Sequence, residues 1–439
     1  MTLQEYINSI KNKRIAVLGI GISNLPLIRL LCYEGCNVTA CDQRPFEQLG
    51  SQALELLALG AKLKLGKDYL SNLDYDLVFR TPGLMPFSFS TTGEVTSEME
   101  LFFRLCPCST IAITGSDGKT TTSSIIAELL KKAGFHVHLG GNIGKPLLCE
   151  VPLIKKDDIA VLELSSFQLH SMICSPDIAV ITNVSPNHLD KHKDYTDYIN
   201  AKKQIFLNQK AGSRLVLNAD DDIVSGFGGT DFFSVQKKVD GCYELDNAIY
   251  RYGRFLMRKD EILIPGEHNV KNFLAAFSAT EGLVSDEICV DVAKNFQGVA
   301  HRLETVRVFD GITFINDSIG SSPTRTIAGL KSLRQKPIII LGGYDKLVPF
   351  DELGEEVVRR AKAAVITGAT AEKISSCVDN AGYLEKYIVP DFDDAVRKAY
   401  EIAAPGDIVL LSPACASFDR FKNFEERGNH FKKIVMELR

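Results

Sequence analysis

The sequence lacks the features that mark membrane-spanning, nucleic-acid-binding and disulfide-stabilised proteins. No apolar run approaches the roughly 20 residues of a membrane-spanning helix, and the apolar stretch 15–22 is too short and glycine-broken for a secretory signal. With 50 basic and 55 acidic residues, the net charge is −5, without the cationic cluster that nucleic-acid binding needs. The 11 cysteines, an odd number, include no C-x-x-C pair. These absences predict a cytoplasmic protein with reduced thiols.

The 439 residues contain no repeat, low-complexity tract or heptad pattern, and short apolar runs alternate with helical stretches. This alternation predicts an α/β fold with mainly parallel sheets, and the length favours about three domains, with boundaries near residues 97 and 300. Residues 304–316 are predicted to form a hairpin, and residues 226–264 a meandering, partly β insertion. The other predicted strands are 15–20, 37–41, 77–80, 111–114, 159–164, 178–183, 214–218, 337–341, 364–367, 387–389 and 408–411.

A first glycine loop, with Gly19 and Gly21, follows a predicted strand and opens a helix. Such a loop lets a phosphate approach backbone amides at a helix N-terminus, and Asp42 stands where a dinucleotide-binding fold places its ribose-binding acid. Asn24 replaces the third glycine of that fingerprint, which makes a nucleotide diphosphate a better candidate than NAD. Arg44 is a candidate partner for a phosphate or carboxylate. The alternative is a tight turn whose glycines serve packing alone.

A second glycine loop, Thr114-Gly-Ser-Asp-Gly-Lys-Thr-Thr121, lies between a predicted strand and a helix that extends to about Lys132. A strand followed by Gly-Lys-Thr and a helix is typical of ATP sites, where amides wrap the phosphates, lysine reaches their oxygens and threonine binds Mg²⁺. The spacing is shorter than that of the common P-loop, because Ile113 stands where that motif has glycine. The context nevertheless predicts ATP binding.

Two later positions, Glu163 and His188, are candidates for a role at this ATP site. Glu163 ends an apolar strand, where an isolated carboxylate favours a metal over a helix cap. His188 follows another strand, within a His-x-Asp-x-His pattern that is a candidate metal-binding sequence. For its last histidine, His192, we favour the alternative, a polar helix start capped by Asn187 or Asp190. Lys202, by composition alone, is a surface lysine.

Several segments, in this order along the chain, resemble those of the Mur ligase family, the ATP-dependent amide-forming ligases of peptidoglycan precursor synthesis. They are Thr114–Thr121, Glu163–Gln168, Asn183–Asp190, His268–Asn272, His301-Arg302 and Asn316–Ser318. The stretch Leu411–Asp419 and the following Phe421–Gly428 resemble the branch of the family that adds D-glutamate. The D-N-P-R motif of the branch that adds diaminopimelate or lysine is absent from the sequence.

The resemblance implies three domains: 1–97, Rossmann-like, binding a UDP-sugar; 98–300, P-loop ATPase-like with a mainly parallel sheet, binding ATP; and 301–439, Rossmann-like, binding the amino acid. It implies UDP-N-acetylmuramoyl-L-alanine, D-glutamate and ATP as substrates, two Mg²⁺ ions and a monomer. It assigns catalysis to Lys119, His188 and Lys202. ATP-binding residues are Gly115, Ser116, Asp117, Gly118, Lys119, Thr120, Thr121, Asn272, Arg302 and Asp317. UDP-sugar-binding residues are Ser23, Asp42, Arg44, Thr81, Pro82, Gly83, Asn142 and His188. D-glutamate-binding residues are Lys346, Ser417 and Phe424. Metal ligands are Thr120, Glu163, His188 and, if carbamylated, Lys202; Lys203 fits the alignment less well.

The chain departs from the family at Ile319 and Ser321, where some members carry lysine and threonine. The glutamate carboxylates therefore need another cation, for which Lys346 and Arg325 are candidates. The implied reaction proceeds through an acyl phosphate that must be kept from water. The alternatives are an alanine-adding ligase, a folylpolyglutamate synthase, a nicotinamide-dependent oxidoreductase and a non-catalytic ATP-binding partner.

Overall fold

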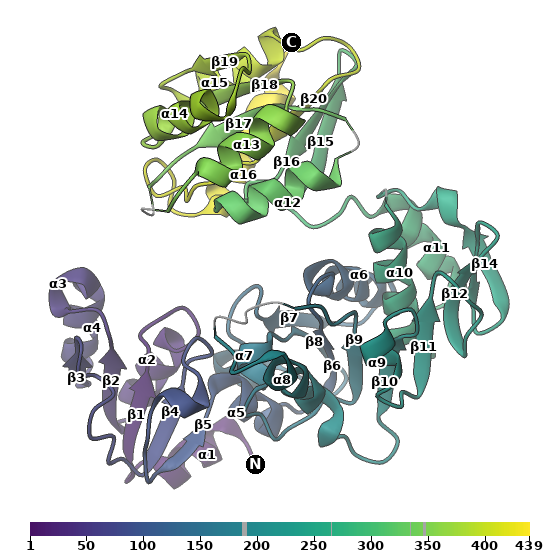
Figure 1. The fold of residues 1–439 in the computed structure, drawn as a ribbon. Helices are drawn as coiled ribbons and strands as arrows, with labels where there is room; N and C mark the ends of the chain where they lie inside the picture. Colours follow the sequence, from purple (N-terminus) through teal and green to yellow (C-terminus); the bar gives the residue numbers. More distant parts are fainter. Residues whose placement is uncertain (187–190, 265, 334, 346–347) are drawn as a thin grey trace. The chain divides into compact units, whose positions relative to one another are not determined.

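The computed structural model describes residues 1–439 except 187–190, 265, 334 and 346–347 (Figure 1). The chain divides into two compact units, Met1–Phe296 and Gln297–Arg439. The three-domain boundaries at residues 97 and 300 stay a prediction. Among the described residues, no helix is long and apolar enough to cross a membrane.

The first sheet of unit 1 is parallel, with the strand order β3-β2-β1-β4-β5 (Figure 1). This is the order of the first five strands of a Rossmann fold, in which the first loop opens at the carboxyl end of the central strand. The strands are β1 (Arg14–Leu18), β2 (Asn37–Asp42), β3 (Lys62–Leu65), β4 (Leu77–Arg80) and β5 (Glu94–Thr96). The helices are α1 (Leu3–Ile10), α2 (Leu25–Tyr33), α3 (Phe46–Leu49), α4 (Ser51–Ala58), the 3₁₀ turn η1 (Pro86–Ser88) and α5 (Glu98–Leu105).

The second sheet of unit 1 has the order β14-β13-β12-β11-β10-β9-β6-β8-β7. From β7 to β12 the strands are parallel; β13 and β14 run antiparallel. The predicted insertion at 226–264 is thus an extension of this sheet. Its strands are β6 (Ser109–Thr114), β7 (Val137–Gly141), β8 (Ile159–Glu163), β9 (Ile178–Ile181), β10 (Arg214–Asn218), β11 (Asp231–Ser234), β12 (Gly241–Leu245), β13 (Ala248–Arg251) and β14 (Arg254–Arg258). Its helices are α6 (Lys119–Lys132), η2 (Leu148–Leu153), α7 (Ser166–Leu169), α8 (Tyr195–Leu207), α9 (Asp222–Ser225), η3 (Lys259–Glu261), α10 (Glu267–Ala279) and α11 (Asp286–Asn295).

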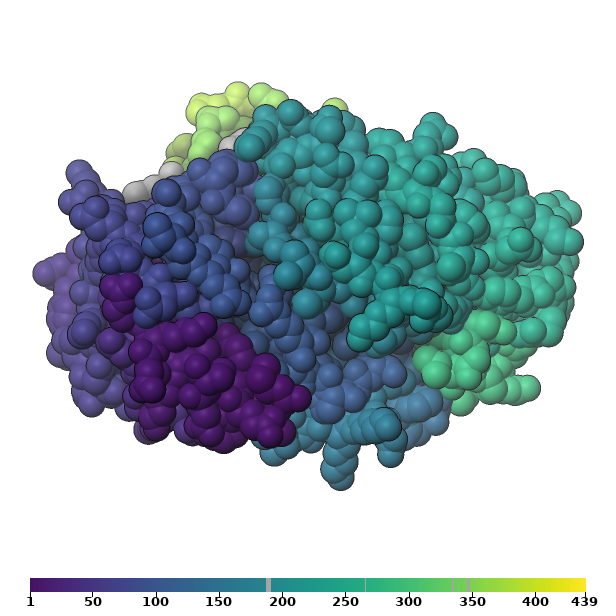
Figure 2. All heavy atoms as spheres, turned by 90° about the horizontal axis from the view of Figure 1, so that it is seen from below, coloured from purple at the N-terminus to yellow at the C-terminus, as the bar shows by residue number. Residues whose placement is uncertain are grey.

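Buried contacts join the two sheets of unit 1. One apolar core runs from Leu3 to Val224 and takes residues from both sheets. Arg80, at the end of β4, donates to the Phe167 carbonyl at 3.1 Å and to the Ser171 hydroxyl at 2.8 Å. Glu98 accepts the Leu148 amide at 2.9 Å. Figure 2 shows the purple N-terminal residues directly beside the blue residues that follow in the sequence.

Unit 2 is built on a sheet with the order β15-β16-β20-β17-β18-β19. The predicted hairpin is present as the antiparallel pair β15 and β16, and the remaining pairings are parallel. The strands are β15 (Glu304–Phe309), β16 (Ile312–Asn316), β17 (Ile338–Gly342), β18 (Ala363–Thr367), β19 (Lys386–Ile388) and β20 (Ile408–Leu411). The helices are α12 (Pro323–Ser332), α13 (Asp351–Arg360), α14 (Ala371–Ala381), α15 (Phe392–Glu401) and α16 (Phe424–Glu437).

These sheets confirm the predicted α/β class. The 11 cysteines are free thiols, and seven of them are buried. Cys415 is one of the buried ones; burial raises its pKa to about 11. It is therefore placed to pack rather than to react as a thiolate.

Candidate active site

The second glycine loop joins β6 to α6, and its two glycines have positive φ angles of 153° at Gly115 and 81° at Gly118. A Cβ atom would lie 1.9 Å from the Thr182 hydroxyl at Gly115, and 2.4 Å from the Asn272 amide oxygen at Gly118. Gly118 is the N-cap of α6 and makes no side-chain cap hydrogen bond, and helix N-termini of this kind favour anions.

The end of β9 holds the loop in place. The Asn183 side chain accepts the Asp117 amide at 2.9 Å and donates to the Asp117 carbonyl at 3.0 Å. The Ser116 hydroxyl contacts the Tyr198 hydroxyl of α8 at 2.8 Å. The loop is therefore preorganised by neighbouring elements of the central sheet.

Two lysine ammonium groups meet at this loop. Lys119 Nζ donates to the carbonyls of Gly115 and Ser116, both at 2.9 Å. Lys202 Nζ, from α8, donates to the Gly115 carbonyl at 2.7 Å. Lys202 is only 1% exposed, so the expectation of a surface lysine from composition is wrong. Burial, and then the positive charge of Lys119, lower the pKa of Lys202 well below its usual range.

Glu163 lies at the end of β8, opposite the first turn of α6. Its carboxylate accepts the Thr120 hydroxyl at 2.7 Å and the Asn142 side-chain amide at 2.8 Å. The predicted metal ligands Thr120 and Glu163 are thus brought together, with the predicted substrate contact Asn142 beside them. The Thr120 hydroxyl and the buried Glu163 carboxylate are hard oxygen donors, and this donor set fits Mg²⁺.

Asn272, on α10, also faces the loop: its amide oxygen accepts the Thr122 hydroxyl at 3.3 Å. This contact places Asn272 in the neighbourhood that its predicted nucleotide role requires. His188, in contrast, lies outside the described residues, as do Asn187 and Asp190. The described helix that follows begins at Tyr195 and is capped by Asp194; the predicted cap at Asn187 or Asp190 lies outside the described residues.

His192 is buried and held at both ring nitrogens. Its Nδ1 lies 2.9 Å from the Asp197 carboxylate, and its Nε2 lies 3.0 Å from the Ser166 hydroxyl. His170 contacts the other carboxylate oxygen of Asp197 at 2.9 Å. His192 therefore belongs to a buried hydrogen-bonded network, in which it connects Asp197 to Ser166.

The first glycine loop is organised by Asp42 and Arg44. The Asp42 carboxylate accepts the Ile20 amide at 2.7 Å and the Arg44 amide and guanidinium at 2.9 Å. Although burial opposes it, this bonding lowers the pKa of Asp42. The Thr81 amide donates to the Leu18 carbonyl at 3.1 Å, which brings the start of the predicted Thr81–Gly83 loop beside β1.

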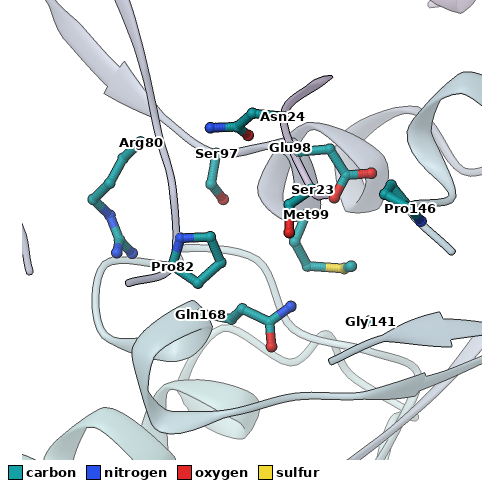
Figure 3. Close-up of a pocket in the computed structure, with 10 residues that line it drawn as sticks. All are labelled: Ser23, Asn24, Arg80, Pro82, Ser97, Glu98, Met99, Gly141, Pro146 and Gln168. Carbon is teal, nitrogen blue, oxygen red and sulfur yellow. The ribbon is translucent and has the colours of Figure 1, made fainter. Parts of the chain in front are cut away.

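A pocket in unit 1 collects part of this predicted UDP-sugar site (Figure 3). It is lined by Ser23, Asn24, Arg80, Pro82, Ser97, Glu98, Met99, Gly141, Pro146 and Gln168. Ser23 and Pro82 are predicted UDP-sugar-binding residues, whereas Arg80 and Gln168 have no predicted role. Arg80 is buried, and burial lowers its pKa to about 10. Arg80 Nε and Asn24 Oδ1 are buried and have no hydrogen-bond partner in the described part of the chain.

In unit 2, Asp317 follows β16 and is buried. Its carboxylate accepts the Ser412 hydroxyl at 2.6 Å and the Leu303 amide at 3.3 Å. Burial nevertheless raises the pKa of Asp317 to about 6, against the lowering effect of those bonds and of Arg302 and Arg325. Arg302 and Arg325 are both exposed.

Ser417 and Phe424 are held by a residue without a predicted role, Arg427. Its buried guanidinium donates to the carbonyls of Cys415 at 3.1 Å and Ala416 at 3.2 Å, and to the Ser318 hydroxyl at 3.0 Å. Ser318 in turn donates to the Phe424 carbonyl at 2.8 Å. Arg427 thus ties the signature loop to the start of α16. Lys346 lies outside the described residues.

Comparisons with known proteins show which family the chain resembles. The model of the Mur ligase middle domain matches residues 113–280, and that of the Mur ligase glutamate ligase domain matches residues 301–415. The UDP-N-acetylmuramoylalanine–D-glutamate ligase of Acetivibrio thermocellus is 47% identical, with 99% of each chain covered.

Two solved structures share the fold. The UDP-N-acetylmuramate-alanine ligase of Thermotoga maritima has a TM-score of 0.57 at 19% identity, covering 97% of this chain and 100% of that one. The MurF ligase of the same organism, in complex with ADP, has a TM-score of 0.53 at 18% identity, covering 89% and 92%. Because the likeness to the curated relative extends over the full length at high identity, the chain belongs to the Mur ligase family.

Proposed function

We propose that the protein is an ATP-dependent ligase that joins D-glutamate to UDP-N-acetylmuramoyl-L-alanine in cytoplasmic peptidoglycan precursor synthesis, and so serves cell-wall formation, cell shape and division. The convergence of Lys119, Lys202 and Glu163 on the Gly115–Thr120 loop supports ATP-driven chemistry. The full-length likeness to relatives named for D-glutamate supports the choice of amino acid.

The proposed reaction first makes the alanyl carboxylate reactive. The carboxylate attacks the γ-phosphorus of ATP, the bond to the ADP oxygen breaks, and an acyl phosphate forms. The amine of D-glutamate then attacks the acyl carbon, loses a proton, and inorganic phosphate leaves. Charge develops mainly on phosphoryl oxygens, so the contribution of Lys119 and the loop amides is positioning and electrostatic stabilisation.

Magnesium fits the donor set at the loop, and when bound it would neutralise charge on the phosphates. Thr120 and Glu163 would hold it; His188 and carbamylated Lys202 are further proposed ligands, for two ions in all. Asn142 donates a hydrogen bond to the same Glu163 carboxylate and would therefore orient this metal ligand.

The amino-acid site is proposed at Ser417, Phe424 and Lys346, with Arg325 as a second candidate cation, since Ile319 carries no charge. Arg427 is a positioning residue for this site, because it bonds the carbonyl of Ser318 and the carbonyls of Cys415 and Ala416, directly before Ser417. The nucleotide is proposed to contact Asn272, Arg302 and Asp317. The UDP-sugar is proposed at Ser23, Asp42, Arg44 and Thr81–Gly83, and the protein is proposed to act as a monomer.

Incubation with ATP, Mg²⁺, UDP-N-acetylmuramoyl-L-alanine and one amino acid at a time tests the assignment. We expect phosphate release and the ligated product by mass spectrometry with D-glutamate, and a background rate with L-glutamate, glycine, L-lysine or diaminopimelate. UDP-N-acetylmuramate with L-alanine serves as a control for an alanine-adding enzyme. Turnover with another amino acid, but none with D-glutamate, would contradict the proposal.

The substitution Asp317→Asn is expected to stabilise the protein while weakening ATP use. Because the pKa of Asp317 rises from an ordinary 3.8 to about 6 on folding, the folded state retains a proton between these pH values that the unfolded chain loses. The free energy of unfolding therefore falls as pH rises from about 4 to 6, by up to about 3 kcal/mol. Thermal unfolding at pH 7.5 should show a higher Tm for the variant, and a smaller pH dependence. KM for ATP should rise, and an unchanged KM would remove Asp317 from the nucleotide site.

A further inference from the structure

A cluster of three side chains lies at the amino ends of β7 and β8, outside the site described above. His136 precedes β7, His138 lies on it, and Asp158 directly precedes β8. His138 Nε2 lies 2.8 Å from Asp158 Oδ2, and His136 Nδ1 lies 3.1 Å from His138 Nε2 and 3.3 Å from the same carboxylate oxygen. Two imidazole nitrogens and one carboxylate oxygen thus converge on a single point.

The cluster is separate from the ATP site. On β8, Glu163 ends the strand that Asp158 precedes, so five residues of extended chain, roughly 16 Å, separate the two carboxylates. On β7, Gly141 pairs with Glu163 and His138 pairs with Ala160, three residues earlier. The proposed magnesium ligands and this cluster therefore occupy opposite ends of the same strands.

The spacing and chemistry of the donors fit a transition-metal ion. With bonds of about 2.0–2.1 Å, donors around a tetrahedral Zn²⁺ ion lie roughly 3.3 Å apart, close to the three distances here. Two imidazoles favour Zn²⁺ and its neighbours over Mg²⁺ or Ca²⁺. The His138 imidazole, with the Lys155 amide, lowers the pKa of Asp158 to about 2, so this ligand is anionic at neutral pH.

The surroundings allow entry of an ion while fixing two of its ligands. The side chains of His138 and Asp158 are 9% and 8% exposed, whereas that of His136 is 72% exposed. The His136 ring can therefore turn to admit an ion, and solvent can supply a fourth ligand. Because β7 is at one edge of its sheet, an ion held here would fasten this edge strand to the segment before β8.

We propose that His136, His138 and Asp158 form a binding site for a divalent transition-metal ion, with Zn²⁺ as its best match, which stabilises the edge of the central sheet. The site is independent of the ligase reaction. It supplies three protein ligands and leaves a position for water, and its occupancy raises the stability of the folded chain by mass action.

Zinc titration of the untagged full-length protein by calorimetry, in excess Mg²⁺ to fill the proposed catalytic site, tests this. We expect one Zn²⁺ per chain at this site, a higher Tm with Zn²⁺, and a visible d–d absorption band when Co²⁺ replaces it. His136→Ala and Asp158→Asn should each weaken Zn²⁺ binding more than about tenfold and abolish the Tm shift. His136 is exposed, so its replacement leaves folding intact.

His430→Ala is the matched control, because it removes an imidazole that contacts a single carboxylate, that of Asp393. It should leave Zn²⁺ affinity unchanged. The second histidine group, His170, His192 and Asp197, stays intact in all variants, so its contribution is constant. Equal Zn²⁺ affinity of wild type, His136→Ala and Asp158→Asn would show a hydrogen-bonded cluster that does not take metal, and would overturn the proposal.

Discussion

Replacing Lys119 by methionine is expected to lower kcat/KM for ligation by roughly 10²–10³-fold while the protein stays folded. The Lys119 ammonium is held at the Gly115 and Ser116 carbonyls, within the loop that is proposed to hold the phosphates. It supplies positive charge where negative charge develops during phosphoryl transfer. Methionine keeps the length of the side chain and its helix propensity but removes this charge.

Lys131→Met is the matched control, because Lys131 is exposed on the last turn of the same helix. Single-turnover phosphate release measures the chemical step, and thermal unfolding checks that both variants are folded. Only Lys119→Met should lose the step. Turnover close to wild type in Lys119→Met would remove Lys119 from the phosphate site.

Lys202→Met is expected to lower kcat/KM by roughly 10²-fold, because it removes the carbamate that is the proposed metal ligand here. We expect no loss of stability in this variant. A neutral amine adds to CO₂, forming an N–C bond and releasing a proton. Burial and Lys119 favour the neutral form of Lys202 by lowering its pKa, which prepares this amine for CO₂. The carbamate would place an anion beside the Lys119 cation.

Labelling with ¹³C-bicarbonate should give a carbamate signal in wild type that Lys202→Met lacks. Lys203→Met provides the comparison, since Lys203 is adjacent but lies over the Phe227 ring. Removal of CO₂ should depress activity, and bicarbonate should restore it. A carbamate signal that persists in Lys202→Met and disappears in Lys203→Met would show that Lys203 is the modified residue, and would contradict this prediction.

The strands that carry the site were predictable because they are continuous apolar runs, whereas the missed strands lack that signal. β3 alternates lysine with leucine, β5 has three residues, and β7 ends in two glycines. The prediction of a surface position for Lys202 is wrong because it rests on the charge of this side chain alone. This lysine belongs to the buried stripe Tyr198, Ala201, Lys202 and Ile205, and that helical spacing would have predicted burial.

Other contacts had no signal in the sequence, because their partners are distant along the chain. Arg80 bonds residues 87 and 91 positions later, and Arg427 bonds Ser318, 109 positions earlier. Each is a buried guanidinium that bonds backbone carbonyls and hydroxyls, which no short motif encodes. The motifs thus identified the loops, whereas the residues that hold those loops in place required the fold.

The two glycines of the second loop bear on how an inhibitor would fare against this enzyme. At Gly115 and Gly118 the backbone angles are unfavourable for other residues, and an added methyl group would overlap Thr182 or Asn272. A compound anchored to this stretch of backbone would therefore touch a surface that the chain cannot reshape by point substitution without distorting its own loop. Escape from such a compound would have to come from surrounding side chains, and those are the ones that ATP itself is proposed to need.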